Sequence, residues 1–274
     1  MERYKIRKPA VAGQFYPSSA SALKREIEDL VDINTQKIDA IACMLPHAGY
    51  MYSGSVAAQT VSRIKVKDKI ILLGPNHTGY GLPFSIMTEG LWQTPLGRIS
   101  IDSSLAGCIL SKSRYLKEDN LAHIYEHSLE VELPFLQYFK NDFEIVPIVL
   151  LSDEIDILKE IGRDIAEGLK GGCLDTVSFV IVASSDMTHY EPHTQAQMKD
   201  KQAIEAILEL NEDKLMDRIR RLDISMCGYS AVVAMLSAAK SLGACSAQLV
   251  KYQTSGDITG DVDSVVGYAG IIVY

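Results

Sequence analysis

The sequence predicts an α/β protein in which a mainly parallel or mixed central sheet carries helices on both faces, within a single domain over residues 1–274. Short apolar runs rich in β-branched residues alternate with amphipathic segments, an order that is typical of α/β folds. Most of these runs are continuously apolar, which is typical of strands covered on both faces. Since no linker, repeat or low-complexity tract divides the chain, one domain is the simplest expectation.

Six apolar runs are expected to form the main strands of the sheet. They cover residues 38–45, 69–73, 143–151, 176–183, 247–255 and 265–274. Residues 94–102 (TPLGRISID) are expected to form a small antiparallel excursion. Residues 256–264 (GDITGDVDS) are rich in Gly and Asp, so we expect a polar turn between the last two strands.

Helical patterns lie between these runs. Residues 19–33 place Leu23 and Ile27 on one face, after serines that suit a helix N-cap. Residues 228–243 are apolar nearly all round, which predicts a buried helix. A proline, Pro134, is expected to kink the helix over residues 126–139 or to end an early turn of it. Further helices are expected over residues 55–64, 153–169 and 195–210.

Composition excludes several classes of partner. The net charge of −8 argues against broad binding to nucleic acid, which needs Lys and Arg to neutralise phosphates. No window holds the 18 or so apolar residues of a membrane span, and the N-terminus lacks the apolar core of a secretory signal.

The five cysteines are widely spaced and form no CxxC motif, so a disulfide framework is not expected. We therefore expect a protein of the reducing cytoplasm.

Three of the six histidines follow predicted strands. His47 comes just after residues 38–45, and His77 just after residues 69–73. His189 follows residues 176–183, with Asp186 beside it. In a parallel sheet the carboxyl ends of the strands share one edge, where sites commonly form. Because neutral imidazole is the commonest protein metal ligand, this edge is a candidate metal site.

Two further residues are candidates for the same site. His127 lies at the expected start of a helix, in the stretch HIYEHSLEVE. Cys227 lies just before the buried helix, where the helix dipole is expected to favour a thiolate, so it is the best placed of the cysteines for chemistry. His123 and His193 are expected to be surface residues.

Seven collinear segments resemble the Memo family. They are RKPAVAGQFYP (7–17), PHAGYMYSG (46–54), GPNHTGYG (74–81), EHSLEVELPFLQ (126–137), SSDMTHY (184–190), MCGYSAV (226–232) and SGDITGDVDSVVGYAG (255–270). Together they span nearly the whole chain, so the resemblance is more specific than any single motif.

The resemblance implies a fold shared with the class III extradiol dioxygenases, which use non-haem iron to open catechol rings. It implies that His47 and His77 are metal ligands, with Cys227 in place of a carboxylate. It implies that His189, with Asp186 beside it, is an acid/base histidine, and that His127 faces the same pocket. A thiolate shifts metal preference towards copper or zinc, although iron remains compatible.

These observations favour a metal-binding protein that acts as an iron- or copper-dependent redox enzyme on an unidentified substrate. Asp186 is expected to orient His189 or tune its pKa, and Tyr50 and Tyr52 are expected to line the pocket or to pack. An alternative is a non-enzymatic adaptor or metal-handling protein whose pocket takes a small molecule or a peptide. A zinc hydrolase ranks third, because no glutamate is clearly placed as its base. Through the resemblance, a functional link to a radical-SAM protein is also expected.

Overall fold

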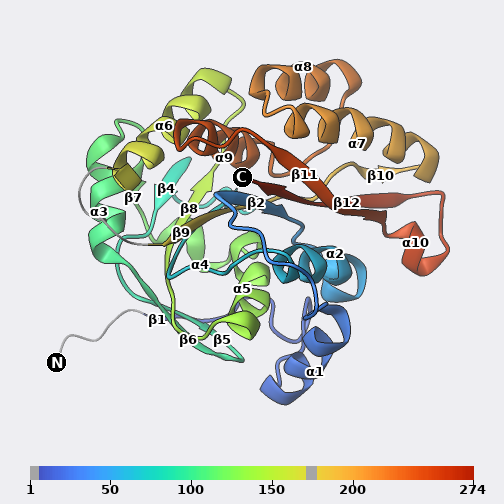
Figure 1. The fold of residues 1–274 in the computed structure, drawn as a ribbon, viewed down its shortest axis with the longest axis horizontal. Coiled ribbons are helices and arrows are strands. Elements are labelled where there is room, and N and C mark those ends of the chain that lie inside the picture. The colour runs from blue at the N-terminus through green and yellow to red at the C-terminus, as the bar shows by residue number, and fades with distance from the viewer. Residues whose placement is uncertain (1–5, 171–177) are drawn as a thin grey trace.

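The computed structural model describes residues 6–170 and 178–274, whose strands form one twelve-stranded sheet (Figure 1). The main path of the sheet runs β1-β5-β6-β8-β3-β9-β2-β12-β10; β11 pairs with β12, while β4 pairs with β8 and with β7. The strands are β1 (Ile6–Arg7), β2 (Ala42–Leu45), β3 (Lys69–Pro75), β4 (Phe84–Ile86), β5 (Leu91–Thr94), β6 (Gly97–Ile101), β7 (Lys117–Glu118), β8 (Glu144–Leu150), β9 (Phe179–Ser184), β10 (His189–Glu191), β11 (Ala247–Thr254) and β12 (Val265–Val273).

The helices are distributed along the whole described chain. They are α1 (Ala20–Leu30), α2 (Tyr50–Ser62), α3 (Ser103–Lys112), α4 (Leu121–Ile124), α5 (Ser128–Phe139), α6 (Ile155–Lys170), α7 (His193–Leu208), α8 (Glu212–Leu222), α9 (Tyr229–Ser241) and α10 (Gly256–Thr259). Every helix expected from the sequence is present, and α9 is buried along nearly its full length, as its apolar composition predicts.

The centre of the sheet is parallel. Strands β8, β3, β9 and β2 lie side by side in parallel, and β12 then pairs with β2 in the antiparallel sense. Leu45, the last residue of β2, lies opposite Ser184, the last residue of β9. The carboxyl ends of β2, β3 and β9 therefore meet at one edge of the sheet, and the residues that follow them are brought together.

Helices cover both faces of the sheet, and each face has its own core. Helices α6, α8 and α9 lie on one side in Figure 1, and α1, α2 and α5 lie on the other. Strand β3 alternates between the two cores: Ile71 and Leu73 pack on the first side, while Ile70 and Leu72 pack on the second. A strand with apolar neighbours on both faces must be apolar at every position. The predicted mixed α/β fold with helices on both faces is confirmed.

Several local expectations need correction or extension. Helix α5 continues unbroken through Pro134, so the expectation of an early end is wrong there. Residues 94–102 contribute to the antiparallel pair β5–β6, as expected. Helices α3 and α8 were not among the predicted elements, although α8 is strongly amphipathic. Residues 176 and 177 of the expected strand lie outside the described residues.

The cysteines do not share one state. Cys43, Cys227 and Cys245 are free thiols. Cys108, on α3, is disulfide-bonded, a bond that the sequence analysis, which expected no disulfide framework, did not predict. The prediction of a reducing compartment therefore draws no support from Cys108.

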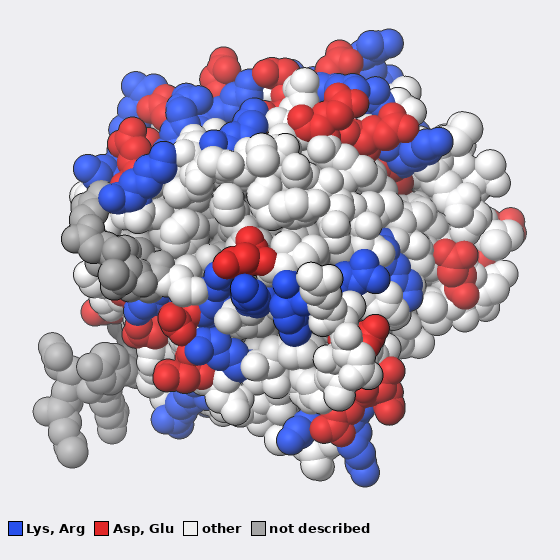
Figure 2. All heavy atoms as spheres, viewed as in Figure 1, with Lys and Arg blue, Asp and Glu red and all other residues white. Residues whose placement is uncertain are grey.

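The surface carries mixed charge. On the face in Figure 2, Lys and Arg are interspersed with Asp and Glu, and a broad uncharged band crosses the middle of the view. Within residues 6–170 and 178–274, no helix combines the length and the apolar character needed to cross a membrane.

Candidate metal centre

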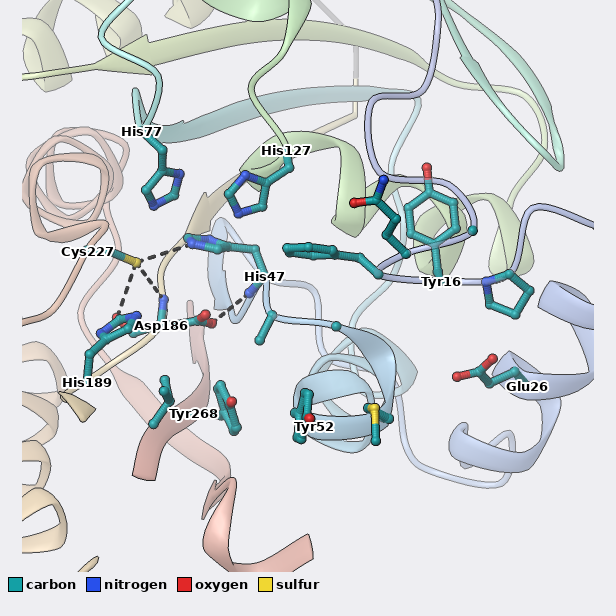
Figure 3. Close-up of a pocket in the computed structure, with 18 of the residues that line it drawn as sticks. Tyr16, Glu26, His47, Tyr52, His77, His127, Asp186, His189, Cys227 and Tyr268 are labelled. Carbon is teal, nitrogen blue, oxygen red and sulfur yellow. Dashed lines mark hydrogen bonds between the residues drawn. The ribbon is translucent and has the colours of Figure 1, made fainter. Parts of the chain in front are cut away.

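Three chain segments converge at the carboxyl edge of the parallel strands (Figure 3). His47 follows β2, His77 follows β3, and Cys227 lies two residues before α9. One ligand atom from each of these residues lies within 4.8 Å of the corresponding atoms of the other two. The His47 ring is edge-on to the His77 ring, with the centroids 5.1 Å apart. The structure thus brings together residues that are far apart in the sequence.

Cys227 approaches His47 closely. Its Sγ lies 3.2 Å from Nε2 of His47 and accepts a hydrogen bond from the backbone N–H of Asp186, at 3.3 Å. Gly228 permits this approach, because a Cβ there would lie 2.2 Å from the carbonyl oxygen of Ser184. Desolvation by burial and the nearby Asp186 carboxyl raise the pKa of the Cys227 thiol. The sequence predicted that the helix dipole favours a thiolate at Cys227. The structure instead favours the protonated thiol when no metal is bound, because the effect of burial is larger than that of the helix dipole.

A chain of buried hydrogen bonds holds the His47 ring. Nδ1 of His47 lies 2.8 Å from Oγ of Ser184, which in turn lies 2.9 Å from Oε1 of Glu132. Ser184 also donates to the carbonyl oxygen of Ser128, also at 2.9 Å. Since that bond uses the one hydroxyl proton of Ser184, Nδ1–H of His47 must donate to Oγ of Ser184. The lone pair of Nε2 is left facing Cys227.

Glu132 completes this chain as a buried acid whose neutral form is favoured by desolvation. Its side chain is fully buried, and its Oε2 has no hydrogen-bond partner among the described residues. Desolvation by burial, reinforced by the Asp186 carboxyl, raises the pKa of Glu132 well above its usual value, although the bond to Ser184 opposes the shift. The hydroxyl of Ser184 is within donating distance of both Oε1 of Glu132 and the carbonyl oxygen of Ser128, which fixes the position of the serine.

The carboxylate of Glu126 orients the His77 ring through Nδ1, as Ser184 orients the His47 ring. Glu126 accepts from Nδ1 of His77 at 2.9 Å and from its backbone N–H at 2.6 Å, and it also accepts from the backbone N–H of Ser128. Burial raises the pKa of Glu126, but the hydrogen bonds and charge of His77 and the bond from Ser128 outweigh it and lower the value to about 2. Nδ1–H of His77 therefore donates to an anion, and Nε2 is left free.

His127 lies against both metal-ligand candidates. Its ring stacks on His77 with the centroids 4.7 Å apart, and it is edge-on to His47 at 5.5 Å. On the other side it contacts Phe15, with the centroids 4.9 Å apart. Burial lowers the pKa of His127, so its imidazole stays neutral at physiological pH. His77, Glu126 and His127 form a second group with the spacing of metal ligands.

Asp186 and His189 are both at the site, but they are not bonded as expected. Asp186 is buried, and its carboxyl accepts from the backbone N–H of His47 at 2.8 Å. Burial raises the pKa of Asp186 to about 6. The hydrogen bonds that orient His189 come from Ser225, whose carbonyl oxygen lies 2.8 Å from Nδ1 and whose Oγ accepts from the backbone N–H. Asp186 therefore positions His47 and Cys227, and Ser225 orients His189.

The two remaining histidines lie away from these groups. His123 is fully buried and its Nε2 lies 3.1 Å from Oγ of Ser85, so the expectation that it lies on the surface is wrong. His193 is half-buried, with Nδ1 2.9 Å from Oγ1 of Thr254. Both are held by hydroxyl groups of neighbouring strands or loops, which the sequence pattern around them did not indicate.

A cavity of about 780 Å³ opens beside the histidines. All six residues expected at the site line it: His47, His77, His127, Asp186, His189 and Cys227. Tyr52 also lines the cavity, whereas Tyr50 is buried behind it, with its ring stacked on Phe135 and its hydroxyl donating to the carbonyl oxygen of Val131. Of the two tyrosines weighed in the sequence, Tyr50 packs and Tyr52 faces the cavity.

Glu130 fixes one wall of this cavity. Its carboxylate accepts from the backbone N–H groups of Ala10 and Val11 and from the hydroxyl of Tyr16, and it pairs with Arg7. Residues 13–17 of the segment held in this way line the cavity. Sequence reasoning missed Glu126, Glu130, Glu132 and Ser184. Glu130 and Glu132 had one local signal, which is that they are a pair of acidic residues inside the otherwise apolar helix α5.

The donor set fits a transition-metal ion. Two imidazoles and a sulfur suit zinc, copper or iron. In both imidazoles Nδ1 is engaged in a hydrogen bond with a supporting side chain, the arrangement in which metal-bound histidines are usually oriented. Nε2 of His47 faces Sγ of Cys227, the third donor of the group. The fold and site thus define an α/β protein with a two-histidine, one-cysteine group at the carboxyl edge of a parallel sheet.

Comparisons with known proteins identify the family. The profile described as Memo-like protein matches residues 7–272, and the chain belongs to the Memo family. It is 44% identical to a MEMO1 family protein of Methanosarcina mazei, covering 98% of this chain and 99% of the relative. A MEMO1 family protein of Aquifex aeolicus is 43% identical with the same coverage, and one of Methanopyrus kandleri is 41% identical, covering 97% of this chain and 98% of the relative.

A solved structure shares the fold. The crystal structure of the uncharacterized protein JW3007 from Escherichia coli K12 superimposes with a TM-score of 0.57. The match covers 84% of this chain and 98% of that one, at 14% sequence identity, so it shows similarity of fold alone.

Proposed function

We propose that the protein binds one transition-metal ion, iron or copper, through Nε2 of His47, Nε2 of His77 and Sγ of Cys227, and acts as a redox enzyme on a substrate held in the adjoining cavity. The observation that carries the proposal is the convergence of these three donor atoms within 4.8 Å. When bound, the metal would supply a redox-active centre with a coordination position open to the cavity.

The residues around the donors have roles that follow from their contacts. Asp186 holds the backbone of His47 through its carboxyl and the sulfur of Cys227 through its N–H. Ser184 and Glu126 fix the ring orientation of the two histidines. This support keeps the donors at one spacing, so little reorganisation accompanies metal binding.

His189 is the proposed proton carrier. Its Nδ1 faces the carbonyl oxygen of Ser225, which can only accept, so Nδ1 carries the proton and Nε2 keeps its lone pair. His189 lines the cavity, where Nε2 can take a proton from a bound substrate and return it. His127 is neutral and lies beside Phe15, which limits the access of water to that side of the donors. We assign His127 to hydrogen bonding with the substrate.

Metal content provides the first test. The protein is purified without oxygen, and bound iron, copper and zinc are measured by elemental analysis. We expect about one ion per chain in the wild type and a large loss in H47A, H77A and C227S, with folding checked by circular dichroism. The matched control is H193A, which removes a histidine outside the site and should keep the metal. Unchanged metal content in H47A and C227S would overturn the proposal.

Redox activity is tested separately. Oxygen uptake is followed with metal-loaded protein and catechol-like reductants, in the wild type and in H189A. We expect uptake by the wild type and a loss of about 10²–10⁴-fold in H189A, the usual contribution of a general acid–base group, with the metal retained. Full metal loading without any uptake would instead favour the non-enzymatic alternative, a metal-handling or ligand-binding protein.

A further inference from the structure

We propose that the cavity takes an organic amine cation, whose charged end lies against Glu26 and the neighbouring aromatic rings and whose other end reaches the His47, His77 and Cys227 donors. This inference rests on the proposed function, because it names the class of substrate for the same cavity. It is drawn from the charges and rings that line the cavity away from the histidines.

Apart from the histidines, the charged side chains among the described lining residues are all acidic. Two acidic residues, Glu26 and Asp186, line the cavity, and no Lys or Arg is among the described lining residues. The Asp186 carboxyl is already used by the backbone of His47. Away from the metal ligands, a bound anion would face Glu26 with no positive side chain to offset the repulsion. A cation would meet a carboxylate that no other group uses.

Glu26 is a partly buried acidic residue at the wall of the cavity. It lies on α1 between the buried residues Leu23 and Ile27, and its side chain extends from the helix into the cavity (Figure 3). No hydrogen bond or ion pair joins it to another described residue. Desolvation by burial raises the pKa of Glu26, with no compensating contact. An ammonium group placed beside it would supply the missing charge and hydrogen bonds.

Aromatic rings lie between Glu26 and the histidines. Tyr52 and Tyr268 are placed along the cavity from Glu26 towards His189, and Tyr16 is on the opposite side (Figure 3). The hydroxyl of Tyr16 is fixed by Glu130, so the position of its ring is held. Burial raises the pKa of Tyr268, so its ring stays neutral. Neutral rings present the electron-rich faces that bind ammonium groups, and they also accommodate an apolar body.

Three compounds of nearly equal shape test the sign of the charge. The probes are 3-phenylpropylamine, 3-phenylpropanol and 3-phenylpropanoate, and binding to the full chain is measured by calorimetry. The primary measurement uses metal-free protein, so that the carboxylate cannot bind through a metal. We expect the amine to bind about tenfold more tightly than the alcohol, the gain of one charge-assisted contact, and the carboxylate to bind most weakly.

Two matched variants locate the effect. In E26Q the amine should bind no more tightly than the alcohol, whereas E28Q, which removes the same charge from an exposed position of α1, should behave as the wild type. Equal amine binding in E26Q and the wild type, or tighter binding of the carboxylate, would overturn the inference. Metal content is measured separately, on the same variants purified without oxygen and without metal removal. Metal retained there with no amine preference in the binding experiment defeats this inference alone, and amine preference with no bound metal defeats only the proposed function.

Discussion

Two buried glutamates at helix α5 support the two histidines of the site, and their pKa values are shifted in opposite directions. Glu126 and Glu132 are both fully inaccessible to solvent. Glu126 accepts two hydrogen bonds from His77 and one from the backbone of Ser128. Glu132 reaches only Ser184 and leaves its second oxygen without a partner among the described residues. The pKa of Glu126 is lowered to about 2, and the pKa of Glu132 is raised well above its usual value.

The difference shows that the number of donors decides the charge of a buried carboxyl. Burial disfavours the anion at both positions, and only Glu126 has enough N–H groups to offset it. This matters for the proposed metal centre. The thiolate of Cys227 and the carboxylates of Glu126 and Asp186 already offset the charge of a divalent ion at neutral pH, so a further anion at Glu132 would add an uncompensated charge in the interior.

Removing the anion should have the largest effect. In E126Q one oxygen remains as an acceptor, so one N–H of His77 or Ser128 loses its partner. We expect metal affinity to fall about 10–100-fold, as for other outer partners of metal-bound histidines, and the free energy of unfolding to fall by about 1–3 kcal/mol. Competitive zinc titration and urea unfolding measure the two effects. Wild-type affinity in E126Q would show that His77 does not depend on this carboxylate.

The neutral glutamate should tolerate an amide. In E132Q the side-chain oxygen can accept from Oγ of Ser184 as Oε1 of the acid does, so metal affinity should stay close to that of the wild type. In E132L this acceptor is lost, and we expect an affinity about tenfold lower. The pair of variants is compared in the same zinc titration. If E132Q is as impaired as E132L, then Glu132 is ionised in the folded protein and the comparison fails.

The pH dependence of stability should have opposite signs for the two residues. The folded pKa of Glu126 lies below its unfolded value near 4.5, so its contribution is present above pH 4.5 and is lost as the pH falls towards about 2. The folded pKa of Glu132 lies above 4.5, so its contribution is present below pH 4.5 and is lost as the pH rises towards the folded pKa. In metal-free protein, the stability of E132Q relative to wild type should therefore increase with pH above 4.5.

The difference in free energy of unfolding between the wild type and each of E126Q and E132Q is measured by urea unfolding between pH 3 and pH 8. Each residue can contribute a slope of at most about 1.4 kcal/mol per pH unit. For E126Q the deficit relative to wild type should shrink in acid, because the wild-type carboxylate then loses its charge as well. Parallel curves for the wild type and E132Q would contradict a neutral Glu132.

The smallest expected effect is the proton released when the metal binds. Burial lowers the pKa of His47 well below its usual value, so His47 is already neutral, whereas burial raises the pKa of Cys227, so its thiol is protonated. Wild type should therefore release about one proton more per ion than C227A at pH 7.5. Calorimetric titration of zinc in buffers of different ionisation enthalpy measures this difference. Equal release would mean that the sulfur is not a ligand.

The sequence by itself determined the fold class and the positions of the main candidates. Continuous apolar runs are a local consequence of burial on both faces, so β3 and β9 could be predicted from composition alone. The placement of His47 and His77 after two such runs indicated a shared edge. The position of Cys227 just before the buried helix made it a candidate for chemistry, and resemblance to the Memo family added its role as a metal ligand. These inferences need only local patterns and the direction of parallel strands.

Only the tertiary structure decided how the site is supported. Glu126 meets His77 across 49 positions of sequence, and Glu132 meets Ser184 across 52. Likewise, Ser225 rather than Asp186 orients His189, across 36 positions. The charge of a buried carboxyl and the free nitrogen of an imidazole depend on which donors surround them in space, and hydrophobic periodicity carries no information about those donors.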